Sequence, residues 1–175
     1  MKKHLFILAI LFFSIAVVNA QSNSNQSFVI GGGLNLALPL GDFKDTHSFG
    51  IGGELQGEYM FSDQFSGVIS AGYTEFFGKT ITFFGQSEKV SNVGLIPILV
   101  GARFYPSANI FVGAKIGVGI LTGGGSSTTA FDYYPHVGYN ADQFQVILGY
   151  NGLSKDGETL SHLGLSFIYK FNSGK

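Results

Sequence analysis

The segment from residue 162 to residue 171 constrains the fold more than any other part of the sequence. Large apolar or aromatic residues occupy every odd position, whereas the even positions hold His162, Gly164, Ser166, Ile168 and Lys170. A β-strand projects successive side chains to opposite faces, so this segment predicts a strand with one apolar and one mostly polar face. Both a soluble β-sandwich and a membrane-spanning barrel use strands of this kind.

Seven earlier segments repeat this alternation and also predict strands. They cover residues 28–38, 49–61, 65–76, 93–104, 110–121, 131–139 and 144–150. The fourth is ambiguous because both of its faces are apolar, and Arg103 alone marks the face that would avoid lipid. Eight segments of similar length, with no composition break between them, predict one all-β domain.

The connections between these segments alternate strictly between short and long. Residues 62–64, 106–109 and 140–143 form short connections that carry turn-forming residues, whereas residues 39–48, 77–92, 122–130 and 151–161 form longer ones. Short periplasmic turns and longer outer loops are typical of outer-membrane barrels. An open sheet edge would leave backbone groups unpaired in lipid, so the sheet must close. The sequence therefore predicts an eight-stranded antiparallel up-and-down transmembrane β-barrel.

The first 20 residues predict a cleaved signal peptide. Lys2 and Lys3 precede an apolar run from Leu5 to Val18, and Val18-Asn19-Ala20 resembles a signal-peptidase site. An uncleaved anchor is the alternative, although the run is short for a spanning helix. Residues 21–26 then form a flexible leader and residues 27–175 form the barrel, which we expect in the outer membrane.

Composition excludes several classes of function. The chain has no cysteine, which rules out disulfides and thiolate chemistry, and it has no basic cluster of the kind that binds nucleic acid. Charged residues make up 12% of the chain, about half the usual quarter for soluble domains. Of the 26 aromatic residues, ten fall near the short-turn ends of the predicted strands and four near the long-loop ends, which suggests two interfacial girdles. Tyr105 and Phe111 are assigned to the girdle at the short turns.

An eight-stranded barrel has a narrow interior, so charged residues on the polar faces should pair there. The residues predicted to point inward are Glu54, Glu58, Arg103, Lys115, Asp132, His136 and Lys170. We expect them to form a structural network that closes the lumen to solutes rather than a catalytic site. No cofactor and no metal site is predicted.

The longest connection, residues 77–92, is the candidate contact surface. Phe83 and Phe84 are apolar where an exposed loop is normally polar, and the alternation from Thr80 to Phe84 suggests a projecting hairpin with an open edge. The partner could be a surface polymer, another outer-membrane component or a host surface. Alternatively, the two rings pack on the barrel mouth.

Four segments carry a resemblance to a known family: residues 96–105, 112–117, 135–139 and 164–171. They resemble the small outer-membrane β-barrel domain family of Bacteroidetes type, often described as porin-family or PorT-like. The resemblance implies a barrel in the outer membrane, in contact with its lipid, and implies no single activity. The last strand is also similar to the signal that the outer-membrane assembly machinery reads, through Gly164, Phe167, Tyr169 and Phe171. We expect a monomer.

Two other classes of function stay open. A lipid-modifying barrel enzyme would need a histidine, a serine and an acid facing lipid, whereas His136 and His162 are predicted to face inward and His47 to lie in a loop. Ser161 and His162 are adjacent in sequence, so they would lie on opposite faces of a strand. A soluble lipocalin-like barrel would need the same alternation reversed, with the large apolar residues inside.

Overall fold

The structure is a computed structural model that describes residues 28–83 and 86–171, with side chains left out at residues 82, 83 and 86. The signal peptide and leader predicted over residues 1–26 therefore lie outside the described residues, and so does Phe84. None of the helices within the described part of the chain is long and apolar enough to cross a membrane.

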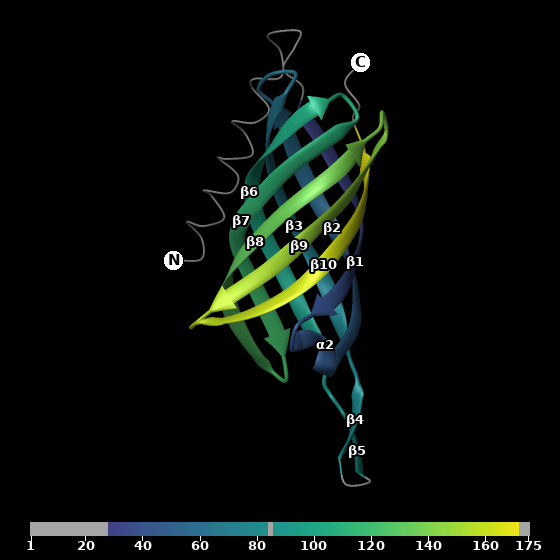
Figure 1. Cartoon of the computed structure of the whole chain (residues 1–175), viewed down its shortest axis with the longest axis vertical. Coiled ribbons are helices and arrows are strands. Elements are labelled where there is room, and N and C mark those ends of the chain that lie inside the picture. Colours follow the sequence, from purple (N-terminus) through teal and green to yellow (C-terminus); the bar gives the residue numbers. More distant parts are fainter. Residues whose placement is uncertain (1–27, 84–85, 172–175) are drawn as a thin grey trace, which may run out of the picture.

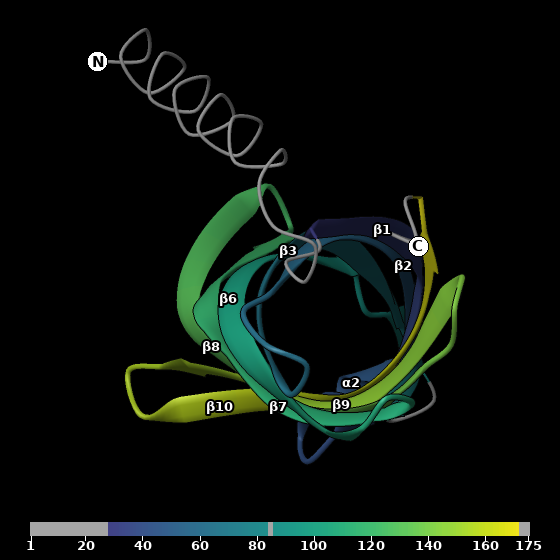
Figure 2. The same cartoon turned by 90° about the horizontal axis from the view of Figure 1, so that it is seen from above.

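Eight strands form a closed antiparallel barrel, which confirms the predicted fold class (Figure 1). Each strand pairs with its neighbours in sequence, and β1 closes the ring against β10, with Leu34 opposite Phe167. Seen along its length, the barrel is a continuous ring of strands (Figure 2). The barrel strands are β1 (Phe28–Leu40), β2 (His47–Met60), β3 (Phe65–Gly78), β6 (Val93–Ser107), β7 (Ile110–Gly123), β8 (Ser126–Asn140), β9 (Phe144–Lys155) and β10 (Glu158–Lys170).

Two of the predicted long loops are instead long hairpins. Strands β7 and β8 run on to a turn at Gly124-Gly125, and β9 and β10 run on to a turn at Asp156-Gly157. All four turn residues have positive φ, between 51° and 89°, as two-residue hairpin turns of this kind require. The prediction of loops at residues 122–130 and 151–161 was therefore wrong. The strands continue beyond the point where apolar and polar residues stop alternating, so the sequence pattern did not show their full length.

The other two long connections contain structure of their own. A four-residue helix, α2 (Phe43–Thr46), lies between β1 and β2. Strands β4 (Thr80–Phe83) and β5 (Gln86–Lys89) form a separate two-stranded sheet that projects beyond the barrel (Figure 1). The hairpin is thus a separate sheet, not a continuous extension of β3 and β6. Together with the β7–β8 and β9–β10 hairpins, these elements define the long-hairpin end, opposite the three short turns.

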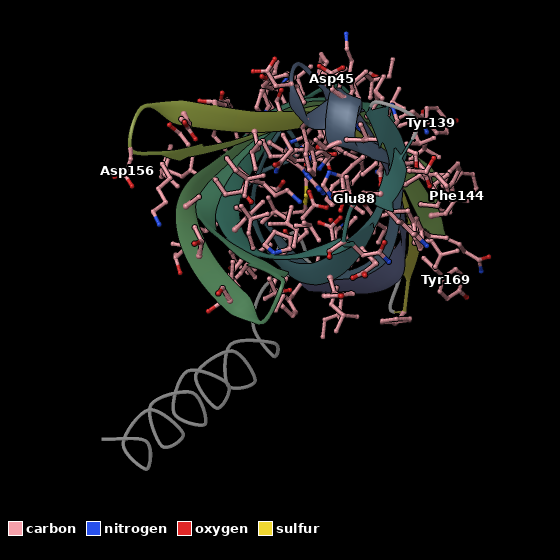
Figure 3. The ribbon with its side chains drawn as sticks, turned by 90° about the horizontal axis from the view of Figure 1, so that it is seen from below. Asp45, Glu88, Tyr139, Phe144, Asp156 and Tyr169 are labelled. Carbon is pink, nitrogen blue, oxygen red and sulfur yellow. The ribbon has the colours of Figure 1, made fainter. Side chains whose placement is uncertain are left out.

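The outer wall is apolar and the interior is filled with side chains. Leu34 and Leu55 are 64% and 62% exposed on the outside, and Tyr139, Phe144 and Tyr169 point away from the ring (Figure 3). Tyr105 and Phe111, assigned from sequence to the outer girdle, are only 4% and 0% exposed and lie inside. Their assignment was wrong because closeness to a strand end was given more weight than strand parity.

Glycines allow this narrow barrel to close. A Cβ atom at Gly33 would lie 1.7 Å from the carbonyl oxygen of Phe167, and one at Gly52 would lie 1.9 Å from that of Tyr73. Both positions face backbone of the neighbouring strand, so no side chain could move aside to make room. The close backbone approach therefore requires glycine.

Candidate functional site

The centre of the lumen holds a buried ion pair between β6 and β2. Arg103 Nη1 lies 2.8 Å from Glu58 Oε2, and both side chains are almost fully buried. Arg103 also donates to Gln56 Oε1 at 3.0 Å, to Gln145 Oε1 at 3.2 Å and, through Nε, to His136 Nε2 at 3.2 Å. The guanidinium therefore bonds to side chains from three other strands, β2, β8 and β9.

The carboxylate of Glu58 is as fully bonded as its partner. It accepts hydrogen bonds from Ser66 Oγ and Tyr105 Oη, both at 2.6 Å, and from Gln145 Nε2 at 3.0 Å. A buried ion pair is tolerable only when further hydrogen bonds offset the loss of hydration. Here each ion has at least three polar partners besides the opposite charge.

A second ion pair joins Lys115 on β7 to Glu54 on β2. The Lys115 ammonium lies 2.6 Å from Glu54 Oε1 and donates to Ser70 Oγ at 2.9 Å. The other oxygen of Glu54 accepts from Ser166 Oγ at 3.1 Å. Lys115 Nζ also lies 4.9 Å from the centre of the Tyr134 ring, close enough for a cation–π contact.

The predicted network also includes Asp132, His136 and Lys170. Asp132 is fully buried and accepts a hydrogen bond from Asn151 Nδ2 at 2.7 Å, and His136 is bonded to Arg103. Lys170 lies towards the short turns and donates to Asn140 Oδ1 at 3.1 Å. Within residues 28–83 and 86–171 there are two Lys or Arg ion pairs, and neither includes Asp132 or Lys170.

Several residues of this network were missed in the sequence. Gln56 and Gln145 link the strands, and Gln56 Nε2 donates to Gln145 Oε1 at 2.6 Å. Both residues lie on the polar face of their strands, and this position in the alternating pattern could have predicted that they point inward. Tyr105 was missed because it was counted as an interfacial aromatic residue.

An apolar layer covers the network at the long-hairpin end. Phe43 of α2 packs edge-on against Phe76 with ring centres 4.9 Å apart, and Phe76 packs against His162 at 5.1 Å. We call this layer the apolar lid; its buried members are Ala37, Phe43, Phe76, Leu95, Ala130 and Leu153. His47, expected in a loop, is the first residue of β2 and contacts Phe43 beneath the same end.

The space enclosed at the long-hairpin side of the lumen is small, whereas a larger one opens at the short turns. Between the lid and the Lys115–Glu54 pair lies a cavity of about 30 Å³, lined in part by Asn151 and His162, which is enough for only one or two water molecules. A wider vestibule of about 430 Å³ opens at the short turns, against Asp63 and Lys170. Among the described residues, no group of three or more His, Asp or Glu could hold a metal ion.

The predicted contact and assembly residues lie on the outside or beyond the described side chains. Phe83 belongs to β4 and pairs with Gln86 across the hairpin, but its side chain, like the whole of Phe84, is not described. In the terminal strand, Phe167, Tyr169 and Phe171 are at least half exposed on the outer wall. Gly164 faces inward, beside the hydroxyl of Tyr134.

Comparison with known proteins identifies the fold. No protein-family model matches the chain, and no curated protein matches its sequence. Among solved structures, Ail, the attachment invasion locus protein of Yersinia pestis, is similar with a TM-score of 0.57 and 15% identity over 85% of this chain and all of that one. Ail has also been solved in complex with the heparin analogue sucrose octasulfate.

Two further barrels are similar to the same extent. The N-terminal β-barrel domain of Pseudomonas aeruginosa OprF gives a TM-score of 0.58 at 13% identity over 85% of this chain and 100% of that domain. Neisserial surface protein A gives 0.55 at 15% identity, over 84% of this chain and 98% of that one. At these identities the similarity shows a shared small-barrel fold.

Proposed function

We propose that the chain is an integral outer-membrane protein, of the small PorT-like kind that its sequence resembles, and that it acts through its outer surface. The observation that carries this proposal is the distribution of polarity across the wall. Large apolar residues are exposed around the outside, whereas Glu58, Arg103, Lys115 and Asp132 are buried inside. In water, such a surface would aggregate, whereas in a bilayer it is the surface that lipid solvates.

The same distribution argues against the lipocalin-like alternative. A lipocalin-type barrel would hold apolar side chains around its cavity and present charges to water. Here the interior carries two ion pairs and the exterior carries leucine, isoleucine, valine and phenylalanine. The inward position of His47, His136 and His162 likewise supports a non-enzymatic role over lipid modification, since that chemistry needs a histidine that faces lipid.

Fractionation of cells tests the location directly. We expect the mature protein in the outer-membrane fraction, resistant to extraction without detergent. The folded barrel should also migrate faster in SDS gels before boiling than after it. Recovery of the protein in the soluble periplasmic fraction would overturn the proposal.

We further propose that the lumen is closed. The apolar lid, the 30 Å³ cavity and the Arg103–Glu58 layer follow one another along the axis, and each is too tightly packed for a hydrated solute. We therefore propose that the function lies in the elements of the long-hairpin end, which the rigid barrel holds in position.

The β4–β5 hairpin is the first candidate among those elements for binding a partner. Its strands pair with each other from Thr80–Lys89 to Phe83–Gln86, apart from the barrel sheet. The outer edges of such a hairpin can accept a strand from a partner, and Phe83 and Phe84 would supply apolar contacts.

Replacing both phenylalanines by serine tests this part of the proposal. The Phe83→Ser, Phe84→Ser protein should insert normally, because neither residue belongs to the barrel wall, but should lose a surface partner captured by crosslinking. Lys89→Ser, at the base of the same hairpin, serves as the control. Unchanged crosslinking in the folded double variant would rule out this hairpin as the contact site.

The terminal strand is proposed to guide assembly. Phe167, Tyr169 and Phe171 form an outward aromatic series on β10 and just beyond it, which supports recognition by the outer-membrane assembly machinery. Membrane lipid and that machinery are thus the proposed partners besides any surface ligand, and a monomer suffices for all of these contacts.

A further inference from the structure

A hinge separates the β4–β5 hairpin from the barrel. The pairing of β3 with β6 ends at Phe76 and Val93, whereas the ladder of the hairpin begins at Thr80. Two short links, residues 77–79 and residues 90–92, join the two sheets. Links of a few residues at the ends of strands are the usual place for a hinge, so the pairing of the barrel does not by itself set the direction of the hairpin.

The two links are held closely to each other. Gly78 N donates to Asn92 Oδ1 at 3.1 Å, and Val90 N donates to Lys79 O at 2.9 Å. A Cβ atom at Gly78 would lie 1.9 Å from the carbonyl oxygen of Val90, so this close approach requires glycine. These contacts join one link to the other, and the hairpin can therefore move as one unit about its base.

Packing on the barrel does not fix the direction of the hairpin either. Ile81, the apolar residue of β4 whose side chain is described, is 42% exposed, and Glu88 and Lys89 on β5 are exposed as well. The hairpin projects away from the ring of strands (Figure 1). Its direction must therefore come from contacts at its base.

The short helix α2 makes such contacts with the hinge. Lys79 N donates to the carbonyl oxygen of Thr46 at 2.8 Å, and the Lys79 ammonium donates to the carbonyl oxygen of Lys44. The end of a helix leaves carbonyl groups without partners inside the helix, and a lysine can satisfy them. Lys79 thus binds α2 through both its main chain and its side chain, and α2 lies beside the base of the hairpin (Figure 1).

The position of α2 depends on the burial of Phe43. This side chain is 6% exposed, and its ring centre lies 4.9 Å from that of Phe76 and 4.7 Å from that of His47. The next two residues of the helix, Lys44 and Asp45, are exposed. Because a helix of four residues is not stable in isolation, we infer that the packing of Phe43 in the apolar lid holds α2 in place.

We propose that the apolar lid sets the orientation of the β4–β5 hairpin through α2, and that Phe43 is the positioning residue of this connection. The contacts run from the lid to Phe43, from the carbonyl oxygens of α2 to Lys79, and from Lys79 into the hairpin. The inference deepens the proposed contact role of the hairpin and rests on it for its functional meaning. A hairpin that is held in one direction loses less freedom when a partner binds.

Amide hydrogen exchange of the folded protein in phosphatidylcholine nanodiscs tests the connection without any partner. The Lys79 amide reports the bond to α2, whereas the Val90 amide reports the bond inside the hairpin base. In the Phe43→Ala variant, exchange at Lys79 should be about tenfold faster or more, because the buried ring no longer holds the helix. Exchange at Val90 should keep the parent rate, because the hairpin moves as a unit. Gel mobility before and after boiling confirms insertion of each sample.

Leu153→Ala is the matched control. Leu153 is 3% exposed and belongs to the same lid, but it lies on β9 rather than on α2. This variant should unfold at lower urea concentration than the parent protein, yet exchange at Lys79 should keep the parent rate. Phe43→Leu retains an apolar side chain and should accelerate exchange at Lys79 by only roughly threefold. It also replaces Phe43→Ala if that variant does not insert.

Capture of a surface partner by crosslinking connects the result to function. Phe43→Ala leaves Phe83 and Phe84 unchanged, yet it should lower the yield of the crosslinked partner, whereas Leu153→Ala should not. A parent protein that captures no partner would refute the proposed contact role, and the exchange rates would then decide the connection alone.

Three results would overturn the inference. Exchange at Lys79 could stay at the parent rate in both Phe43 variants, or it could accelerate equally in Leu153→Ala, which would indicate general loosening of the lid. Exchange at Val90 could accelerate as much as at Lys79, which would show that the hairpin melts rather than turns. Full crosslinking by a Phe43→Ala protein with fast exchange at Lys79 would show that the orientation has no role in binding.

Discussion

Replacing Arg103 by leucine tests whether the lumen network stabilises the barrel. The change removes hydrogen bonds to Glu58, Gln56, Gln145 and His136, together with a stacking contact on Phe111 at 4.5 Å. Glu58 is left as an unpaired buried anion, which typically costs about 3–5 kcal/mol. It keeps three donors, from Ser66, Tyr105 and Gln145, so we expect a loss near the lower figure.

Urea unfolding of the reconstituted protein measures this loss. The chain has no tryptophan, so unfolding is followed by the gel mobility of unboiled samples and by circular dichroism. With a slope of about 2 kcal/mol per molar urea, a loss of about 3 kcal/mol lowers the midpoint by roughly 1.5 M.

The double variant Arg103→Leu, Glu58→Leu is the informative control. The double variant removes the unpaired Glu58 carboxylate, and we expect it to be more stable than the Arg103→Leu variant. If the single variant unfolds at the midpoint of the parent protein, Arg103 contributes nothing to a buried network. If the double variant is the less stable of the two, the penalty does not come from an unpaired carboxylate.

Three further outcomes are expected. In planar bilayers, neither the parent protein nor the Arg103→Ala variant should conduct ions, because the apolar lid still closes the barrel axis. The Arg103→Ala, Phe76→Ala double variant should show higher conductance. Large steady conductance of the parent protein would refute a closed lumen. Gly33→Ala should destabilise the barrel by about 1–3 kcal/mol in the same urea assay, whereas Gly53→Ala should be nearly neutral, since its Cβ would meet nothing closer than 3.6 Å. Tyr169→Ala with Phe171→Ala should lower the amount of protein in the outer membrane without moving the urea midpoint, and normal accumulation would show that the terminal aromatics do not guide assembly.

The barrel was predictable from sequence because the bilayer imposes a period of two on every strand. Between Val112 and Ile120, apolar residues alternate with glycine and lysine, and the observed strand presents its lysine inward and its isoleucines outward. Arg103 alone was enough to orient β6, whose two faces are otherwise equally apolar. A buried arginine needs polar partners, and the lumen is where polar partners lie.

The elements outside the apolar band could not be read in the same way. Ser126 to Thr129 belong to β8, yet they carry no apolar alternation, since water contacts both sides of a hairpin beyond the membrane. The Asp156-Gly157 pair did favour a tight turn, but the length of the connection suggested a loop. Phe43 was not assigned a role, because one apolar residue in a four-residue helix has no period from which to infer burial.

The lumen is held together by side-chain bonds between strands, whereas the β4–β5 hairpin at the long-hairpin end is separate from the barrel sheet. This difference indicates which part of the protein can carry its function. Substitutions inside the lumen act on stability, because Arg103 and Lys115 each bond to several strands. Substitutions on the β4–β5 hairpin break no strand pairing of the barrel, because that hairpin forms a separate two-stranded sheet. The outer end can therefore vary in sequence while the barrel remains the same. This separation explains how proteins with 13–15% identity to this chain can share its fold.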